Sequence, residues 1–219
     1  MSEAQKGYRT VHTGGQGEIV EKKSRFIATV RPVTTEEEAV NFINEMKKQY
    51  WDARHNCSAF VLGSNQEISR CSDDGEPAQT AGRPMLDVLL KEGLTNVAVV
   101  VTRYFGGVLL GTGGLVRAYQ KSVQEGLAAC SIIEKKSACI LMVGTDYNGV
   151  GKLQYLFAQK EISILESEYG ADVTFTVLVP QERKEEMHKA ITEQTGGKAS
   201  LVWGDEVLYG VAGKEVMLF

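Results

Sequence analysis

The 219-residue sequence lacks any long apolar segment. Its longest apolar stretch, VAVVV at 97–101, has the length of a strand and falls far short of the roughly 18–20 residues that span a bilayer. Residues 1–17 are polar and contain no apolar core of the kind a secretory signal needs. We therefore expect a cytoplasmic protein with no membrane partner.

Cysteine and histidine are also scarce, which limits thiol and metal chemistry. The four cysteines, Cys57, Cys71, Cys130 and Cys139, form no CxxC pair. Because cytosolic thiols stay reduced, we interpret them as small buried side chains. The three histidines lie in distant segments, whereas zinc needs three or four ligands. Neither a GxSxG elbow nor the motif of the zinc deaminases occurs. We predict no catalytic residue, no metal site and no cofactor.

Positive charge is not in excess either. The formal net charge of −4 and the pI near 5.5 argue against a protein that coats nucleic acid through its global field. A local basic groove stays possible, because binding depends on where the lysines and arginines lie. With 43% apolar and 24% charged residues the composition is that of an ordinary globular protein, and the length favours two small domains.

The apolar pattern of the first half alternates strands and helices. Thr35 and Glu38 have the spacing of a capping box, and apolar residues recur with helical period up to residue 50, which predicts a helix. The β-branched run at 97–102 is apolar on both faces and predicts a strand covered on both sides. The other predicted elements are strands at 17–31, 56–62 and 67–71, a loop at 72–84, and helices at about 84–93 and 115–127.

The second half has a different order. Residues 131–136 are charged and non-periodic, so we place a linker there. The pattern that follows, strand–helix–strand–strand–helix–strand, is typical of a ferredoxin-like domain. Whether 205–219 adds a strand or lies over the surface is left open. The predicted organisation is an N-terminal tail at 1–16, a first domain at 17–130, the linker at 131–136 and a ferredoxin-like domain with its tail at 137–219.

A glycine-dense loop follows the buried strand. Five glycines within nine positions permit positive φ angles and close approach of a ligand or another backbone, and free N–H groups at the following helix start can receive an anion. Arg103 and Arg117 bracket the loop and could neutralise a phosphate. Because neither a Walker A lysine nor a dinucleotide fingerprint is present, a tight crossover and an anion site both stay open. The glycines are Gly106, Gly107, Gly111, Gly113 and Gly114.

An acidic loop precedes the helix predicted at about 84–93. Asp73, Asp74 and Glu76 lie within four residues, and Arg83 follows closely. The three carboxylates could bind Mg²⁺, form a solvated turn, or pair internally with Arg83 and the two arginines of the glycine loop. We favour internal pairing, because an ordered loop this polar needs partners for its backbone and charges.

Three separated motifs carry a resemblance. HNCSAFVLG at 55–63, CSDDGEPAQTAGRPMLDVL at 71–89 and VVVTRYFGGVLLGTGGLVRAY at 99–119 resemble the signature of the IMPACT family N-terminal domain, over roughly residues 17–130. The resemblance implies an α+β protein. Its first domain would be an α/β sandwich like a small-subunit ribosomal protein and domain IV of elongation factor G. The second would be the ferredoxin-like domain of bacterial members, which resembles domain V of that factor.

The resemblance also suggests a function. Eukaryotic members regulate translation initiation, so we expect a non-enzymatic protein that binds nucleic acid, RNA above all, or associates with the ribosome, and that takes part in translation. Two alternatives stay open: a Mg-dependent enzyme acting on a small phosphate-containing or nucleotide ligand at the glycine loop, and a protein-interaction scaffold. The candidate binding residues are Arg103, Gly106, Gly107, Gly111, Gly113, Gly114, Arg117, Asp73, Asp74, Glu76, Arg83, His55 and Asn56.

Overall fold

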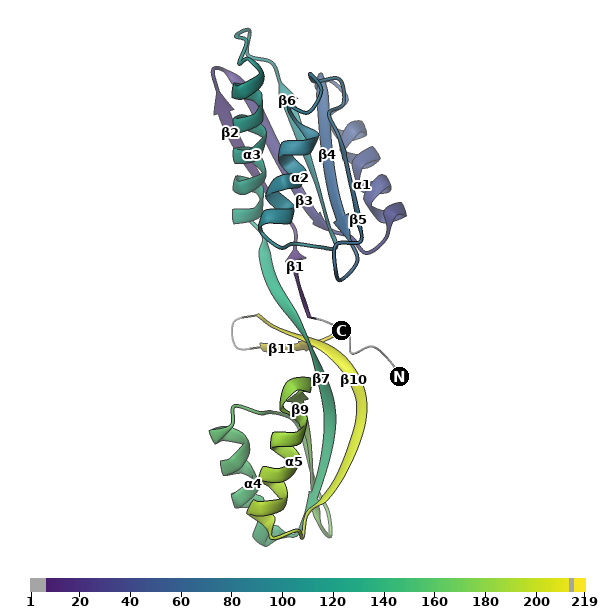
Figure 1. Ribbon diagram of the computed structural model, residues 1–219, viewed down its shortest axis with the longest axis vertical. Coiled ribbons are helices and arrows are strands. Elements are labelled where there is room, and N and C mark those ends of the chain that lie inside the picture. The colour runs from purple at the N-terminus through teal and green to yellow at the C-terminus, as the bar shows by residue number, and fades with distance from the viewer. Residues whose placement is uncertain (1–6, 213–214) are drawn as a thin grey trace. The chain divides into compact units, whose positions relative to one another are not determined.

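An antiparallel sheet with helices on both faces organises the N-terminal unit (Figure 1). The computed structural model describes residues 7–212 and 215–219, and the chain divides into two compact units, residues 8–134 and residues 135–219 together with residue 7. In the first unit five strands have the order β2-β3-β6-β4-β5. The elements are β2 (Gly15–Glu21), β3 (Ser24–Pro32), α1 (Glu36–Gln49), β4 (His55–Leu62), β5 (Ile68–Ser72), α2 (Gly82–Lys91), β6 (Val97–Tyr104) and α3 (Thr112–Ala128).

The central strand β6 confirms the prediction of a strand covered on both sides. Successive side chains of a strand point to opposite faces. Val97, Val99 and Val101 therefore pack into the core beneath α2 and α3, and Ala98 and Val100 into the core beneath α1. Burial on both faces is why this segment reads as a continuous apolar run.

Helix α1 begins as its capping residues predict. The Thr35 hydroxyl accepts a hydrogen bond from the Glu38 N–H (3.1 Å), and the Glu38 carboxylate accepts one from the Thr34 N–H (2.6 Å). These bonds satisfy backbone donors that the first turn leaves without partners. Ala39, Phe42 and Met46 form the buried face of the helix.

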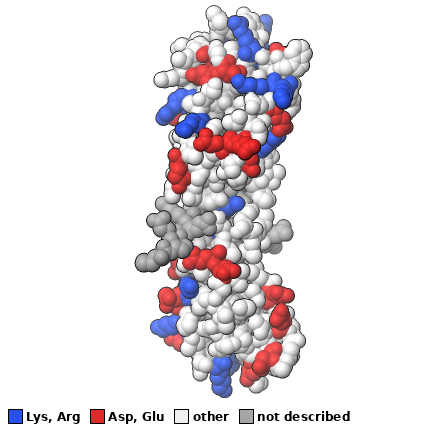
Figure 2. Space-filling model, turned by 90° about the vertical axis from the view of Figure 1, so that its right-hand side faces the viewer, with Lys and Arg blue, Asp and Glu red and all other residues white. Residues whose placement is uncertain are grey.

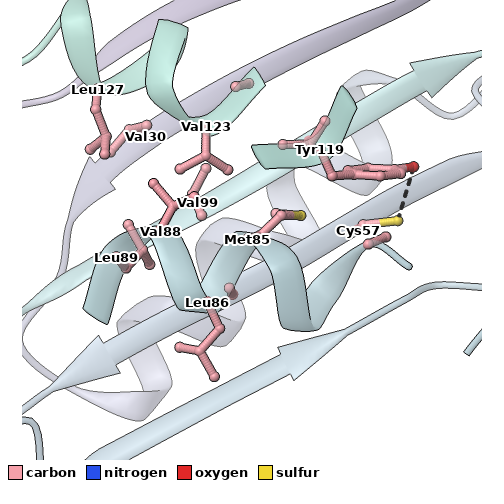
Figure 3. Close-up of a cluster of buried hydrophobic side chains, with 14 of the residues drawn as sticks. Val30, Cys57, Met85, Leu86, Val88, Leu89, Val99, Tyr119, Val123 and Leu127 are labelled. Atoms are coloured by element: carbon pink, nitrogen blue, oxygen red, sulfur yellow. Dashed lines mark hydrogen bonds between the residues drawn. The ribbon is translucent and has the colours of Figure 1, made fainter. Parts of the chain in front are cut away.

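The other face of the sheet carries α2 and α3. Figure 3 shows side chains of both helices gathered around Val99. The rings of Tyr119 and Phe26 meet edge to face, with their centroids 5.2 Å apart. Tyr119 is fully buried, as its place on the apolar stripe of its helix predicts. Helix α3 is thereby anchored to β3 of the sheet.

The predicted N-terminal tail needs correction. Strand β1 (Tyr8–Thr13) and the first residues of β2 occupy much of 1–16, while residues 1–6 lie outside the described part of the chain. The carbonyl oxygen of Arg9 accepts a hydrogen bond from the Thr95 N–H (3.0 Å), and Val11 is buried. Backbone pairing holds this short strand, which has a single buried apolar residue. Its sequence therefore shows little of the alternation of apolar and polar residues that predicts a strand.

The C-terminal unit follows the predicted strand–helix–strand–strand–helix–strand order. Its sheet has the order β11-β10-β7-β9-β8, with antiparallel neighbours. Helices α4 and α5 cover one face, and Phe157 and Phe175 meet edge to face in the core between them and the sheet. The elements are β7 (Ser131–Thr145), α4 (Tyr147–Gln159), β8 (Ser163–Tyr169), β9 (Val173–Pro180), α5 (Lys184–Thr195), β10 (Ser200–Ala212) and β11 (Glu215–Leu218).

Two boundaries differ from the prediction. The predicted linker at 131–136 is the first part of β7, a regular strand in which Ile133 is buried and its neighbours are more exposed. The segment 205–219, left open between a strand and a surface tail, continues β10 and adds β11, with Tyr209 opposite Leu218. Among the described residues, no helix combines the length and apolar character needed to cross a membrane.

Because the backbone is closely packed at Gly17, a larger side chain there should lower the free energy of unfolding. A Cβ atom at Gly17 would lie 2.4 Å from the backbone carbon of Glu125 in α3, whereas one at Gly151 in α4 would meet nothing within 4 Å. We expect Gly17→Ala to destabilise the N-terminal unit by about 1–3 kcal/mol through overpacking. Gly151→Ala, the matched control, should stabilise the C-terminal unit by up to about 1 kcal/mol through helix propensity. Guanidinium unfolding midpoints measure both, and equal shifts in one direction would contradict the packing argument.

Candidate functional site

A cavity of about 460 Å³ lies where the acidic loop, the glycine loop and the start of β4 meet. Much of its wall is apolar, and its polar residues come from all three segments. His55 opens β4, Arg103 lies near the end of β6, and Thr112 is the first residue of α3. The lining residues are Arg54, His55, Gly75, Glu76, Pro77, Arg103, Phe105, Leu109, Leu110, Gly111, Thr112 and Leu115.

Asp73 holds the acidic loop against the start of α2. Its carboxylate accepts hydrogen bonds from the N–H groups of Gln79 (2.8 Å), Ala81 (3.0 Å) and Gly82 (2.8 Å). The N-cap residue Ala81 has no side-chain oxygen of its own. A carboxylate from earlier in the chain therefore satisfies the free donors of the first turn, where the helix dipole also favours a negative charge.

Asp74 ties the same loop to β4 and α1. Its carboxylate accepts from Lys47 Nζ (2.6 Å) and from the Asn56 N–H (2.7 Å). Burial raises the pKa of Asp74, but the two hydrogen bonds together with the positive charge of Lys47 leave the pKa below its usual value. The carbonyl oxygen of Asp74 lies 2.9 Å from His55 Nδ1. Because a carbonyl oxygen only accepts, Nδ1 carries a proton, and in the neutral form of the ring Nε2 is then an acceptor.

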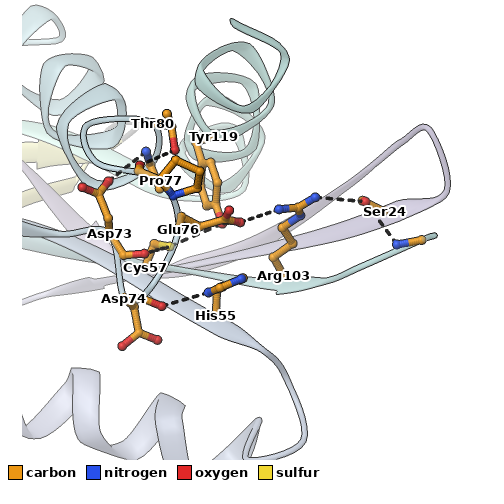
Figure 4. Close-up of polar contacts among 12 residues, drawn as sticks. Ser24, His55, Cys57, Asp73, Asp74, Glu76, Pro77, Thr80, Arg103 and Tyr119 are labelled. Carbon is orange, nitrogen blue, oxygen red and sulfur yellow. Dashed lines mark hydrogen bonds and ion pairs between the residues drawn. The ribbon is translucent and has the colours of Figure 1, made fainter. Parts of the chain in front are cut away.

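Glu76 and Arg103 form a buried ion pair at the centre of the site (Figure 4). Glu76 Oε1 accepts from Arg103 Nη1 (2.6 Å) and from the Tyr119 hydroxyl (2.8 Å), and the two charged side chains are only 3% and 7% exposed. On its other side the guanidinium reaches Ser24 Oγ (3.5 Å), which also accepts from the Gly106 N–H (3.2 Å). The pair therefore joins the acidic loop to the glycine loop through β6.

Internal pairing of the acidic loop, the favoured reading, is confirmed for Glu76 and only in part for the rest. Asp73 and Asp74 pair with backbone N–H groups and Lys47 rather than with an arginine. Arg83 pairs with Asp87 on the surface of α2. Arg103 is also a candidate phosphate contact in the sequence analysis. Its burial against Glu76 corrects this, because its charge is already neutralised inside the fold.

Cys57 lies under this network. Its Sγ is 3.0 Å from the carbonyl oxygen of Asp73 and 3.3 Å from the Tyr119 hydroxyl. Burial raises the pKa of the Cys57 thiol to about 12 and also raises the pKa of Tyr119. A thiol this hard to ionise is a packing group rather than a nucleophile. Cys71, interpreted as buried, is in fact exposed at the edge strand β5.

The five glycines of the loop serve different ends. Gly106 permits close approach, since a Cβ atom there would collide with the backbone of Lys23. Gly107 and Gly111 have φ angles of +83° and +73°, which favour glycine. Gly113 and Gly114 lie in the first turn of α3, whose N-cap, Gly111, provides no side-chain hydrogen bond. The tight crossover is therefore present, and the N-terminus of α3 is left without a capping side chain.

A second, smaller pocket of about 250 Å³ lies on the other side of the start of α3. It contains the predicted residue Arg117 together with Lys22 and Lys121, opposed by one carboxylate, Glu21. Leu110 lines both pockets. We call this smaller pocket, with its three cations, the basic pocket. We call the larger pocket the apolar cavity.

The structure thus brings together part of the predicted set and adds to it. His55, Glu76, Arg103 and Gly111 line the apolar cavity, whereas Asn56 is buried beside it, with its side-chain oxygen accepting from Thr102 Oγ1 (2.7 Å). Several site residues belong to no sequence motif and were not predicted. The exposed apolar tip of the glycine loop was the available signal for some of them. The additions are Leu109, Leu110, Thr112 and Leu115 in the cavity, Lys22 and Lys121 in the basic pocket, and Ser24 in the hydrogen-bond network.

Removal of one partner of the buried ion pair should be costly. Glu76→Gln leaves the guanidinium of Arg103 buried without a counter-charge, and we expect it to lower the free energy of unfolding by about 3–5 kcal/mol. The double variant Glu76→Gln/Arg103→Met should cost less than the sum of the two single changes, because no unpaired charge remains. Glu45→Gln, which breaks the exposed pair with Arg31, is the control and should cost about 1 kcal/mol or less. A Glu76→Gln cost no larger than this control would contradict the argument.

The low pKa of Asp74 predicts a pH-dependent contribution to stability. A carboxyl whose pKa is lower in the folded than in the unfolded chain stabilises the fold once ionised, and this contribution disappears as pH falls through the folded pKa. We expect Asp74→Asn to be less stable than the wild type near neutral pH. The difference should shrink below about pH 4, near the usual pKa of an aspartate. Urea unfolding at a series of pH values measures it, and a difference independent of pH would contradict the assignment.

The chain is similar to known proteins in both of its units. Residues 22–127 match the Impact N-terminal domain, and residues 143–198 match a domain of unknown function (DUF1949). The chain is 44% identical over 198 residues to the IMPACT family member YvyE of Bacillus subtilis, covering 90% of this chain and 91% of the relative. It is 35% identical to the IMPACT family member YigZ of Escherichia coli, covering 83% and 90%.

A solved structure agrees over most of the chain. A crystal structure of a hypothetical protein is 32% identical, has a TM-score of 0.58, and covers 90% of this chain and 97% of its own. The Impact N-terminal domain match includes both loops, the apolar cavity and the basic pocket. With two bacterial relatives aligned over nearly their whole length, the chain belongs to the IMPACT family.

Proposed function

We propose that the N-terminal unit binds single-stranded RNA across the start of α3, and that the protein acts in translation as a non-enzymatic binding protein. One observation carries the proposal. An apolar cavity with an aromatic side chain and a basic pocket lie on either side of a helix N-terminus that has no capping side chain. Single-stranded nucleic acid needs this combination, because its bases stack on aromatic rings while its phosphates follow cationic side chains.

The basic pocket suits the phosphate backbone. Lys22, Arg117 and Lys121 are exposed and face a single carboxylate, Glu21, in a chain of net charge −4. On the face shown in Figure 2 acidic and basic side chains are interspersed, so cationic surface there is local. Free N–H groups in the first turn of α3 add a further preference for anions. We therefore infer a short contact, of a few phosphates, rather than a coating of the nucleic acid.

The family supports a role in translation. Relatives that align with this chain over 98–106 residues include proteins named IMPACT in Mus musculus and Xenopus laevis, and an IMPACT homologue in Dictyostelium discoideum. The likeness to domains IV and V of elongation factor G, expected from the motifs, would place both units on a fold used for ribosomal contact. We accordingly propose ribosomal or other structured RNA with an unpaired segment as the target.

The Mg-dependent enzyme receives less support from the geometry. The carboxylate oxygens of Asp73 and Asp74 already accept hydrogen bonds from backbone N–H groups and Lys47, and Glu76 is committed to Arg103. A cation at the acidic loop would have to displace these donors. A protein-interaction scaffold is favoured by one feature, the side chain of Leu109, which is 82% exposed at the tip of the glycine loop.

RNA binding should depend on the basic pocket and on salt. We expect a fluorescent single-stranded RNA to bind the wild type with an affinity that falls linearly on a log–log plot against salt. Arg117→Ala/Lys121→Ala removes two cations, so the slope should become shallower by up to about 1.4, at about 0.7 per phosphate contact on a single strand. Fluorescence anisotropy across a salt series measures both quantities.

The control is Arg70→Ala, which removes one cation from an exposed site on β5 outside both pockets. It should leave the slope unchanged. Absence of RNA binding by the wild type, or equal slopes for the wild type and the double variant, would reject the proposed function. Partner capture from nuclease-treated lysate through Leu109, lost in Leu109→Ser, would then favour the scaffold.

A further inference from the structure

We infer that the apolar cavity is a subsite for one unpaired nucleotide, with its base beside Phe105 and its phosphate between Arg54 and the start of α3. The inference rests on the proposed RNA binding and gives it a defined ligand, a nucleoside monophosphate unit. The basic pocket would then hold the neighbouring backbone, because the two pockets meet at Leu110. Four features of the cavity carry the argument.

The first feature is its size and its walls. At about 460 Å³ it falls within the range of small-molecule sites, which are mostly apolar with a few polar groups. Phe105 and Leu109 are 47% and 82% exposed, so a planar ring can reach them without displacing the fold. Pro77 and Leu115 complete the apolar surface on the sides of the acidic loop and of α3.

The second feature is a hydrogen-bond donor without a partner. Two guanidinium nitrogens of Arg103 are used by Glu76 and Ser24, but Nε is buried and has no acceptor within the described chain. A buried donor without an acceptor is unfavourable, because folding has removed its hydrogen bonds to water. Arg103 also lines the cavity. An acceptor on a bound ligand, such as the carbonyl oxygen of a base, would satisfy this donor once a small shift of the cavity wall exposes Nε.

The third feature is an acceptor of fixed orientation. Nδ1 of His55 donates to the carbonyl oxygen of Asp74, so in the neutral form of the ring Nε2 is an acceptor. A base amino group or a ribose hydroxyl can donate to it. An acceptor and a donor, on two side chains held in place by the acidic loop, match the mixed hydrogen-bonding edge of a nucleoside better than a purely apolar ligand.

The fourth feature is the place for a phosphate. Thr112, the first residue of α3, lines the cavity, and the N-cap Gly111 supplies no side-chain oxygen to its first turn. Arg54 lies exposed on the opposite segment, just before β4. A dianionic phosphate would meet free N–H groups and one guanidinium here, whereas an uncharged nucleoside would use only the apolar walls and the polar edge.

Mononucleotide titrations test the subsite. Isothermal titration of the full chain with uridine 5′-monophosphate or adenosine 5′-monophosphate should give saturable one-site binding, tighter than that of uridine or ribose 5-phosphate alone. We expect Phe105→Ala to weaken mononucleotide binding about tenfold, the effect of losing a base–aromatic stack. Arg54→Ala should weaken binding of the nucleotide and leave binding of uridine unchanged, because only the nucleotide carries the phosphate.

Matched controls come from the same loop and sheet. Val108→Ala changes an exposed neighbour outside the cavity, and Arg70→Ala an exposed arginine on β5, so both should bind mononucleotides like the wild type. If Phe105→Ala fails to fold, Leu109→Ser, at a side chain that is 82% exposed, replaces it in the test.

The outcomes separate this inference from the proposed function. RNA binding without any saturable mononucleotide binding would overturn the subsite alone. Mononucleotide binding that Phe105→Ala, Leu109→Ser and Arg54→Ala all leave intact would overturn it too. Mononucleotide binding that responds to these variants, in a protein that does not bind RNA, would support the subsite and reject the proposed function.

Discussion

The buried ion pair between Glu76 and Arg103 is the interaction on which the candidate site depends. It lies inside the N-terminal unit, where an unpaired charge would be strongly unfavourable. The acidic loop can therefore take only conformations that bring its carboxylate to β6. Through Ser24 the same guanidinium also reaches the glycine loop. Two loops that are separate in sequence are in this way held at a fixed distance, and the apolar cavity lies between them.

This arrangement divides the work among the polar residues. The carboxylates of the acidic loop stabilise the fold: Asp73 caps α2, Asp74 joins β4 to α1, and Glu76 neutralises Arg103. The groups left for a ligand are their neighbours, chiefly Arg54 and the ring of Phe105. A motif rich in charge can thus mark a site without supplying its contacts, because buried charges must first satisfy one another.

Much of the fold could be predicted from residue pattern. The two-sided apolar run of β6, the capping residues of α1 and the strand–helix order of the C-terminal unit depend on local periodicity and propensity, which the sequence carries directly. The predictions failed at β1 and at the start of β7. Those segments become strands through backbone pairing with distant residues, and their own side chains give little indication of it.

For the site, the sequence by itself located the segments that build it: the glycines of the crossover with the two arginines that bracket them, and the acidic loop. The tertiary structure decided which of them stay accessible. Arg103 and Arg117 both flank the glycine loop, and the sequence does not distinguish them. In the structure Arg103 is buried against a carboxylate 27 positions away, whereas Arg117 is exposed in the basic pocket. The physical reason is that the energy of a charge depends on its surroundings, and only the packed fold brings those surroundings together.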